Sequence, residues 1–279
     1  MSTYGAPPAT ELEVTLTADQ VAFYRENGFL VVDRITTDEE IDWFQRIYED
    51  MFDPERVDGV VRPVDRSGVR DEACARTITQ VFHPELDVPE ILASTYVRNA
   101  KRIASALLDI STDDLTVWTH MIRKAPGAAE VPPHQDEAFW PADFDYRSVA
   151  AWMPLHDVPV DMGAMQFLPG SHRDGVRHHR HYDHPLQSLL TVDPPVADDA
   201  FVACPLPAGG CTFHDPATVH RTAVNATGRP RLALPLTVQS VPIRRATRRE
   251  TPWLDEHLAA GGREQTSYVA DGRVLPLPV

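Results

Sequence analysis

The triplet His134-Gln135-Asp136 is the part of this 279-residue sequence whose residue types and spacing could bind a metal ion. A histidine and a carboxylate two residues apart in a strand point the same way, because side chains alternate between the two faces. His220, from a distant second strand, would complete a face of two histidines and one carboxylate. Such a face leaves about three positions of an octahedral ion open and is typical of non-haem Fe(II) sites that use a 2-oxo acid and O2. Arg231 offers a permanently charged, two-pronged group for a carboxylate.

The triplet alone is a weak signal, but the turns around it support the prediction. Pro132-Pro133 stiffens the approach to His134, and we expect strand pairing to begin only after these prolines. Gly209-Gly210 predicts a turn into a strand that ends at His214, and Asp215-Pro216 predicts a second turn just before His220. His214 is therefore the alternative to His220 as the distal ligand.

Four stretches of the sequence together carry a resemblance to a known family. They are residues 16–32, residues 133–136, residues 151–155 with 163–172, and residues 213–231. In these stretches the chain resembles the phytanoyl-CoA dioxygenase family of Fe(II)/2-oxoglutarate oxygenases, and the likeness spans most of its length. The threonine two residues after His220, and the spacing to Arg231, favour His220 over His214.

The resemblance implies a fold, cofactors and residue roles. The fold would be mainly β with flanking helices: a double-stranded β-helix (jelly-roll, cupin-like) core with N-terminal helices. His134, Asp136 and His220 would be the catalytic ligands of Fe(II). Arg231 would form a salt bridge to the distal carboxylate of 2-oxoglutarate, and Thr222 would hydrogen-bond the same group. With O2, the implied activity is hydroxylation or another oxidation of a small molecule, and the intact Asp136 argues against halogenation.

Charge and composition exclude other classes. The net charge is −15, whereas nucleic-acid binding needs a basic face. The basic cluster at residues 244–249 is interpreted as a solvated loop that could steer an anionic substrate. No apolar run approaches the roughly 20 residues of a membrane span, and residues 1–8 do not resemble a secretory signal. Cys74, Cys204 and Cys211 lack paired spacing, which favours a reducing cytoplasm. We expect a small-molecule substrate, no nucleic-acid or membrane partner, and a monomer or homodimer.

The sequence predicts one domain over residues 1–279, with helices first and strands later. We expect a flexible leader at 1–14, helical support at 15–110 and the jelly-roll core with the metal site at 111–245. Capping residues and apolar spacing predict helices from Thr17 to Asn27 and from Thr37 to Asp53, and one or two more over 88–108. Residues 55–80 have no clear period. Strands are expected at 29–32, from 115 onward, and near 148–154, 164–168, 200–205, 211–214 and 231–240.

Aromatic, basic and histidine residues outside the metal face are candidates for contacts with the substrate or cosubstrate. Phe139 and Trp140 follow the metal triplet and are candidates for the substrate wall, with ordinary packing as the alternative; Trp152 is a further candidate. Arg123, with Lys124 beside it, could meet an acidic substrate or be a loop charge. His120 could help to bind 2-oxoglutarate or be a hydrogen-bonded core residue.

Long connections and histidine-rich segments complete the predictions. Residues 55–80 and 171–200 are candidates for a lid over a small molecule. The tract 177–184 could be a second metal site, although its arginines favour a solvated or substrate-covering loop. An acyl-CoA is less expected, since the acidic chain lacks an obvious phosphate site, and secondary metabolism is favoured. The alternative function is a non-oxidative jelly-roll protein that binds metal or ligand.

Overall fold

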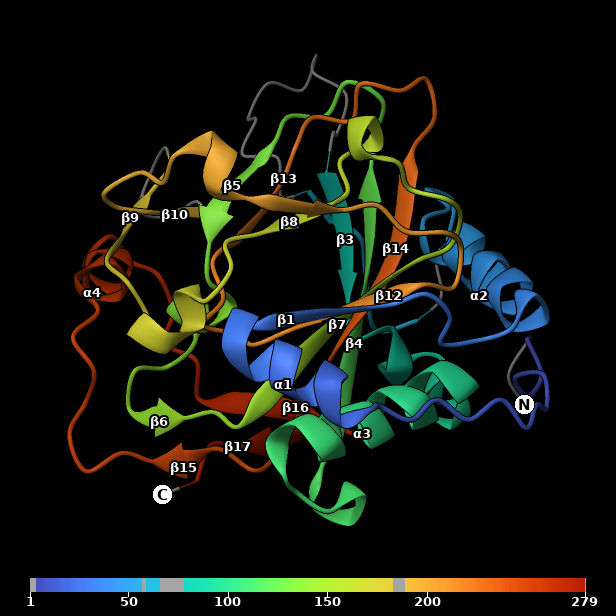
Figure 1. Cartoon of the computed structure of the whole chain (residues 1–279), viewed down its shortest axis with the longest axis horizontal. Helices are drawn as coiled ribbons and strands as arrows, with labels where there is room; N and C mark the ends of the chain where they lie inside the picture. The colour runs from blue at the N-terminus through green and yellow to red at the C-terminus, as the bar shows by residue number, and fades with distance from the viewer. Residues whose placement is uncertain (1–3, 57–58, 66–77, 183–188, 279) are drawn as a thin grey trace.

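The computed structural model describes residues 4–56, 59–65, 78–182 and 189–278 (Figure 1). Two antiparallel sheets form its centre, one of seven strands and one of four. Their inner faces pack together, since Phe29 and Trp152 of the larger sheet share a buried apolar cluster with Met165 and Phe167 of the smaller one. The predicted mainly-β jelly roll with flanking helices is therefore confirmed.

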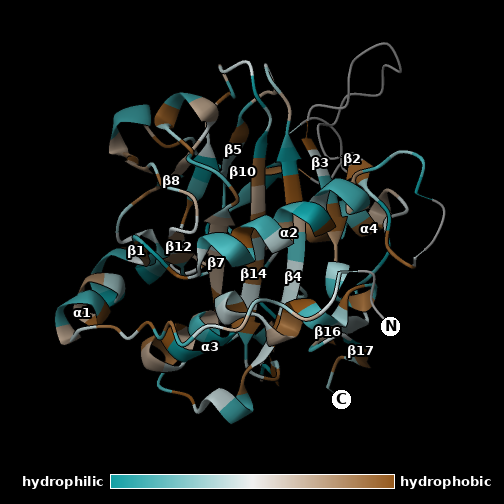
Figure 2. Ribbon diagram, turned by 90° about the vertical axis from the view of Figure 1, so that its right-hand side faces the viewer, coloured by the Kyte–Doolittle hydropathy of each residue, from teal (hydrophilic) through white to brown (hydrophobic). Residues whose placement is uncertain are grey.

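The larger sheet carries two of the cosubstrate candidates, His120 and Arg231. All its neighbouring strands are antiparallel, and most neighbours in space are not consecutive along the chain (Figure 2). In spatial order they are β1 (Phe29–Val32), β12 (Cys211–His214), β7 (Ser148–Pro154), β14 (Arg231–Gln239), β4 (Thr116–Lys124), β3 (Ile78–Phe82) and β2 (Val64–Asp65).

The smaller sheet carries His134 of the metal triplet and the distal histidine, His220. Its strands in spatial order are β11 (Val202–Cys204), β8 (Met165–Phe167), β13 (His220–Thr222) and β5 (Val131–His134). Three further pairs are β9 (His179–His181) with β10 (Leu190–Val192), β6 (Phe144–Asp145) with β15 (Ile243–Arg244), and β16 (Ser267–Ala270) with β17 (Arg273–Pro276).

Helices α2 (Asp38–Met51) and α3 (Thr95–Leu108) lie across the larger sheet (Figure 2), as the apolar spacing of their sequences predicts. The apolar residues along one side of α2 are buried in the main core together with the apolar residues of α3. The other helices are α1 (Ala18–Asn27) and α4 (Pro252–Ala259), and the 3-10 turns are η1 (Pro84–Leu86), η2 (Pro89–Ala93), η3 (Thr112–Asp114), η4 (Asp136–Phe139), η5 (Val160–Met162), η6 (Ser171–Asp174) and η7 (Asp198–Ala200). Within the described residues, no helix has the length and apolar composition needed to cross a bilayer.

The capping box predicted for the first helix is present, and the end of that helix is linked to the metal region. Thr17 and Gln20 exchange side-chain hydrogen bonds with each other's backbone N–H, and Gly28 ends α1 with φ of +80°. A Cβ on Gly28 would lie 2.4 Å from the Thr218 hydroxyl, which donates to the Gly28 carbonyl. Glycine is therefore required where α1 packs beside the chain that leads to His220.

Several boundaries differ from the sequence prediction. The region 15–110 is not only helical support, because β1, β2 and β3 extend the larger sheet; β3 lacks a visible period since both its faces are partly covered. Residues 4–14 are anchored rather than free: Trp43 donates to the Tyr4 carbonyl, and Asn99 binds the backbone on both sides of residue 13.

Two further differences concern prolines and the C-terminal region. Strand β5 includes Pro132 and Pro133, although pairing was expected only after them; it is an edge strand, so one side needs no donors. Beyond residue 245 the chain adds α4 and the β16–β17 hairpin, which no predicted element covered. Asp271 fixes the hairpin to β4 by accepting from the Val117 N–H and donating to its carbonyl, both at 2.9 Å.

Candidate active site

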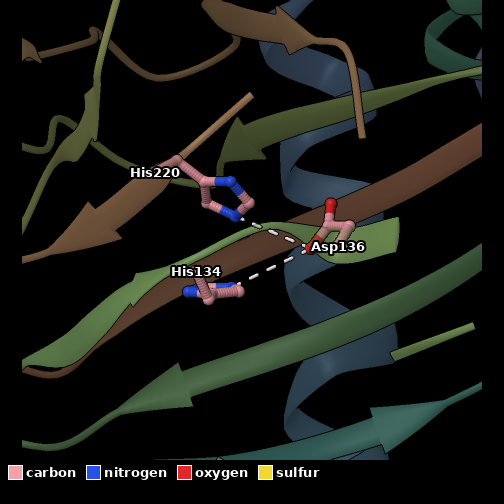
Figure 3. A group of neighbouring side chains, drawn as sticks. All are labelled: His134, Asp136 and His220. Carbon is pink, nitrogen blue, oxygen red and sulfur yellow. Dashed lines mark ion pairs between the residues drawn. The ribbon is translucent and has the colours of Figure 1, made fainter. Parts of the chain in front are cut away.

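The metal triplet and its distal histidine come together at the end of the smaller sheet (Figure 3). His134 ends β5 and His220 begins the neighbouring β13, so their rings lie 4.2 Å apart between centroids. Asp136 begins η4 rather than continuing the strand, as the alternation argument had assumed. Nε2 of His134 and of His220 lie 3.9 and 3.6 Å from Oδ1 of Asp136. All three ligand atoms lie within 4.8 Å of one another, too far apart for hydrogen bonds but well placed around one ion.

The protonation of the two histidines also fits a metal. Nδ1 of His134 donates to the Pro132 carbonyl at 2.8 Å, and Nδ1 of His220 donates to the Thr218 carbonyl at 2.9 Å. Each Nε2 therefore presents a lone pair, as backbone-oriented metal ligands do. Burial lowers the pKa of both histidines, which keeps them neutral at pH 7. Burial alone would raise the pKa of Asp136, but His220 and the hydrogen bond from His214 hold it below its usual range.

His214 supports this site from the opposite sheet. It ends β12, and its Nε2 donates to Oδ2 of Asp136 at 3.1 Å. That nitrogen cannot ligate a metal while it makes this bond. The geometry therefore favours His220 as the distal ligand and makes His214 a residue that orients the carboxylate.

Gln135, between the two proximal ligands, was not singled out by the sequence argument. Its side chain is fully buried and donates to the carbonyls of Gly175 and Ala217. The side-chain amide oxygen of Gln135 accepts from the Arg177 N–H at 2.7 Å. These bonds tie the end of β5 to the two segments that pack around the metal site. The only signal in the sequence was a polar residue between two residues of metal-binding type.

Beside the metal site lies a second buried group of polar residues, centred on Arg231. Arg231 begins β14 and pairs with Lys124 of β4, and both side chains are almost fully buried. Nζ of Lys124 donates to the Thr222 hydroxyl at 3.1 Å and to the Ala223 carbonyl. Among the described residues, no carboxylate forms an ion pair with either cation, and Nε of Arg231 has no hydrogen-bond partner. Two buried positive charges without a counter-ion are costly, so this group fits an anionic ligand.

The charge state of this group depends on pH. Burial and the neighbouring Arg231 lower the pKa of Lys124 to about 7. Burial lowers the pKa of Arg231 to about 10. Because this value is still well above neutral pH, the guanidinium stays charged. From the sequence, Lys124 was equally plausible as a loop charge, because its cross-strand pairing with Arg231 depends on the fold.

Arg231 is positioned by two contacts. Its Nη1 donates to the Gly163 carbonyl, and its guanidinium carbon lies 5.1 Å from the ring centre of Trp152. Gly163 has φ of +82°, and a Cβ there would lie 2.6 Å from the Ala223 carbonyl. Trp152 is buried under the guanidinium, so its place is beside the anion group rather than in an open substrate wall.

Phe139 and Trp140, predicted to line the substrate site, lie at the end of η4, the turn that begins with Asp136. The Phe139 ring lies edge-on to His134 at 5.8 Å, and Trp140 packs edge-on to Tyr146 at 4.8 Å. Trp140 lines a cavity of about 360 Å³ together with Trp118, and Phe139 lines a second cavity of about 220 Å³.

Two other predicted residues lie away from these groups. Arg123 is exposed and alternates with Lys124 along β4, so it does not line either cavity. Its side chain lies on the opposite face of β4 from that of Lys124, and the substrate role predicted for it stays a prediction. His120 is four residues from Lys124, about 13 Å along the strand. It lies among Phe82 and Trp118 with ring centres 5.6 and 5.5 Å away, so the register does not bring it beside Arg231.

The histidine tract and the basic cluster are built into the fold. His179 in β9 is buried and its Nε2 accepts from the Gln135 N–H at 3.2 Å, so this part is not a solvated loop. Within the part of the chain that the structure describes, His134, Asp136 and His220 form the one candidate metal group; residues 183 and 184 lie outside that part. In the basic cluster, Arg249 pairs with Glu137, and other arginines pair with acids.

Cys204 and Cys211 are buried and free, whereas Cys74 and much of the proposed 55–80 lid lie outside the described residues. The second proposed lid, residues 171–200, contains η6, β9, β10 and η7 in its described parts.

Comparisons with known proteins agree with this geometry. The family model described as Phytanoyl-CoA dioxygenase (PhyH) matches residues 24–233. The crystal structure of EvdO2 from Micromonospora carbonacea var. aurantiaca, complexed with 2-oxoglutarate, is 30% identical, with a TM-score of 0.76 over 88% of this chain and 99% of that chain. Peroxisomal phytanoyl-CoA dioxygenase of Homo sapiens is 26% identical over 184 residues, which is 59% of this chain and 50% of that protein. The nogalamycin epimerase SnoN, at 22% identity and a TM-score of 0.59 over 81% of this chain and 85% of that chain, shares the fold.

The fold and the site together define a class: a jelly roll with a two-histidine, one-carboxylate face beside a buried arginine is the architecture of the 2-oxoglutarate-dependent dioxygenases. Because the family match covers most of its length, the chain belongs to the phytanoyl-CoA dioxygenase family. It spans about half the length of the human relative.

Proposed function

We propose that this protein is an Fe(II)- and 2-oxoglutarate-dependent oxygenase that hydroxylates or otherwise oxidises a small organic molecule, in secondary metabolism and in the cytoplasm, as a monomer or homodimer. The observation that carries the proposal is the pairing of the metal face with two buried cations, Lys124 and Arg231, that lack a carboxylate partner among the described residues. A protein that only binds metal has no need of that anion site.

One set of residues binds the metal, and a second set binds the cosubstrate. His134, Asp136 and His220 hold one face of the ion and leave the others for ligands. When bound with 2-oxoglutarate, Fe(II) supplies O2 activation, with release of succinate and CO2 and oxidation of a substrate C–H bond.

The anion group fixes the orientation of the cosubstrate. Arg231, Lys124 and Thr222 bind its distal carboxylate, which points the keto acid end toward the metal. Trp152 covers the guanidinium and excludes water, which strengthens the charge interaction.

The test is the optical spectrum of the anaerobic protein with Fe(II) and 2-oxoglutarate. We expect a weak visible charge-transfer band, since the band requires both the metal face and the oxo acid in one site. A non-oxidative binding protein would give no band with 2-oxoglutarate. A screen for substrate-dependent succinate release then identifies the substrate.

We expect the affinity for 2-oxoglutarate to fall as pH rises. Because the pKa of Lys124 is about 7, its attractive charge is lost as pH rises through this value in the free protein. A bound carboxylate favours the ammonium form, so the dissociation constant should increase about tenfold from pH 6 to pH 8. Anaerobic titration of the visible band measures it. Lys124→Met should bind more weakly at pH 6 and show little pH dependence; an equally steep dependence in that variant would contradict the assignment.

Trp140→Ala should uncouple succinate formation from substrate oxidation. Trp140 packs on Tyr146 and lines the larger cavity, so its loss widens the wall that holds the substrate. We expect the ratio of product to succinate to fall severalfold, measured by chromatography of both in one reaction. Trp140→Phe, which keeps an aromatic wall, should stay near the parent ratio. An unchanged ratio in the alanine variant would make Trp140 a packing residue.

A further inference from the structure

The larger of the two cavities, of about 360 Å³, is lined by residues of β3, β4, β14 and β16 and of the loop that follows η4. Five of its lining side chains are aromatic, including Trp118, Trp140 and Tyr268, and the polar ones are neutral or histidine. None of the described residues that line it is Lys, Arg, Asp or Glu. A site of this size and composition suits a small molecule with flat ring faces and no net charge.

Two walls of the cavity come from elements that also carry residues of the candidate active site. Trp140 is the residue at which η4 ends, and this turn begins with Asp136. Trp118 lies on β4 with its ring 5.5 Å from that of His120 and 5.5 Å from that of His83. The cavity is therefore bounded by the loop that supplies a metal ligand and by the strand that supplies Lys124.

The remaining wall comes from outside the family match. That match ends at residue 233, whereas Gln239, Gln265 and Tyr268 all line the cavity. The β16–β17 hairpin is held over β4 by two hydrogen bonds, from the Val117 N–H to the Asp271 carboxylate and from the Asp271 N–H to the Val117 carbonyl. One wall of the cavity thus comes from a segment that follows the part of the chain carrying the family's metal and anion residues.

His83 gives the cavity an oriented polar group. It follows β3 with φ of +57° and ψ of +48°, directly before Pro84. A residue before proline is normally excluded from helical conformations, so this backbone is strained. The surroundings maintain it: the His83 N–H donates to the Thr119 carbonyl at 2.9 Å, and the chain turns into η1.

A buried carboxylate sets the tautomer of this histidine. Glu85 is fully buried, and its Oε2 accepts from both the backbone N–H and the hydroxyl of Thr119, the latter at 2.6 Å. Its Oε1 lies 3.3 Å from Nδ1 of His83, so that nitrogen is the donor. Nε2 is left as an acceptor, and among the described residues it has no hydrogen-bond partner. The ring borders the cavity and is partly exposed.

We propose that this cavity binds a neutral, ring-containing, hydroxylated substrate of the glycoside type, whose hydroxyl donates to Nε2 of His83 while its ring stacks on Trp118, Trp140 or Tyr268. The inference rests on the proposed oxygenase function and names the substrate class for it. An acyl-CoA or another phosphorylated molecule is excluded, because its charges would meet no cation there.

The experiment uses the full chain with Fe(II) and 2-oxoglutarate under anaerobic conditions. The probes are methyl glucopyranoside, phenyl glucopyranoside and maltotriose, with palmitoyl-CoA and glutamate as charged comparators. We expect at least one neutral glycoside to shift the visible band saturably and the charged molecules to leave it unchanged. If no neutral glycoside shifts the band, or only a charged comparator does, the proposal is wrong. If the band never forms, the oxygenase function itself fails, which is a distinguishable result.

Two variants of His83 separate recognition from folding. His83→Asn tolerates the left-handed backbone and keeps a donor near Glu85, but it lacks an atom at the position of Nε2. We expect it to weaken glycoside binding about tenfold while the affinity for 2-oxoglutarate stays unchanged. His83→Gln, which returns a carbonyl near that position, should recover part of the loss, and His178→Asn on the exposed surface should change nothing. Unaltered glycoside affinity in His83→Asn would overturn the proposal.

Discussion

Replacing His134 or Asp136 by alanine is expected to abolish both iron retention and turnover. Each substitution removes one of three protein ligands whose atoms lie within 4.8 Å of one another, and the described structure offers no substitute ligand at that distance. Iron content after gel filtration and substrate-dependent succinate release measure the two effects. Near-normal activity in either variant would rule out this metal site.

His214 provides the matched control for the distal ligand. Because Nε2 of His214 donates to Asp136 and is therefore not available to the metal, His214→Ala should weaken iron binding by only about 10- to 100-fold. His220→Ala should instead behave like the loss of His134. If the effects of the two variants were exchanged, His214 would be the distal ligand. His178→Ala, an exposed histidine that touches neither site, should retain full iron content.

Arg231→Ala is expected to raise the KM for 2-oxoglutarate by far more than it lowers kcat. The guanidinium is buried over Trp152 with an unpartnered Nε, so its removal leaves a buried carboxylate with only Lys124 and Thr222. A loss of about 2–5 kcal/mol is expected for such a pair, which is about 30-fold to about 4,000-fold in affinity. Arg231→Lys keeps the charge without the two-pronged geometry and should fall between.

The control for this prediction is Arg123→Ala. Arg123 is adjacent to Lys124 on the same strand, but its side chain is exposed and outside both cavities. Its loss should leave the KM for 2-oxoglutarate within about twofold, as is usual for exposed charges. An unchanged KM in Arg231→Ala would show that the oxo acid binds elsewhere.

The local elements were predictable where one physical signal dominated. The box Thr17–Gln20 and the following Gly28 fix the two ends of α1, since capping and a left-handed turn are properties of a few adjacent residues. The apolar stripe of α2 and the alternation in β4 likewise depend on a single covered surface. Strand β3 lacked such a pattern, because the main core covers Val81 on one face while Phe82 lines the aromatic cavity on the other.

By itself, the sequence determined the ligand types, their order along the chain, and the arginine that follows them. Side-chain chemistry and short spacings are local, so His134, Asp136, His220 and Arg231 could be named as candidates before any fold was known. Only the tertiary structure decided how Lys124 and His83 are used. Cross-strand register places Lys124 opposite Arg231, and a buried Glu85 two residues beyond His83 orients its ring toward the cavity. These relations depend on which distant strands become neighbours, and that is set by burial of the whole core rather than by any local pattern.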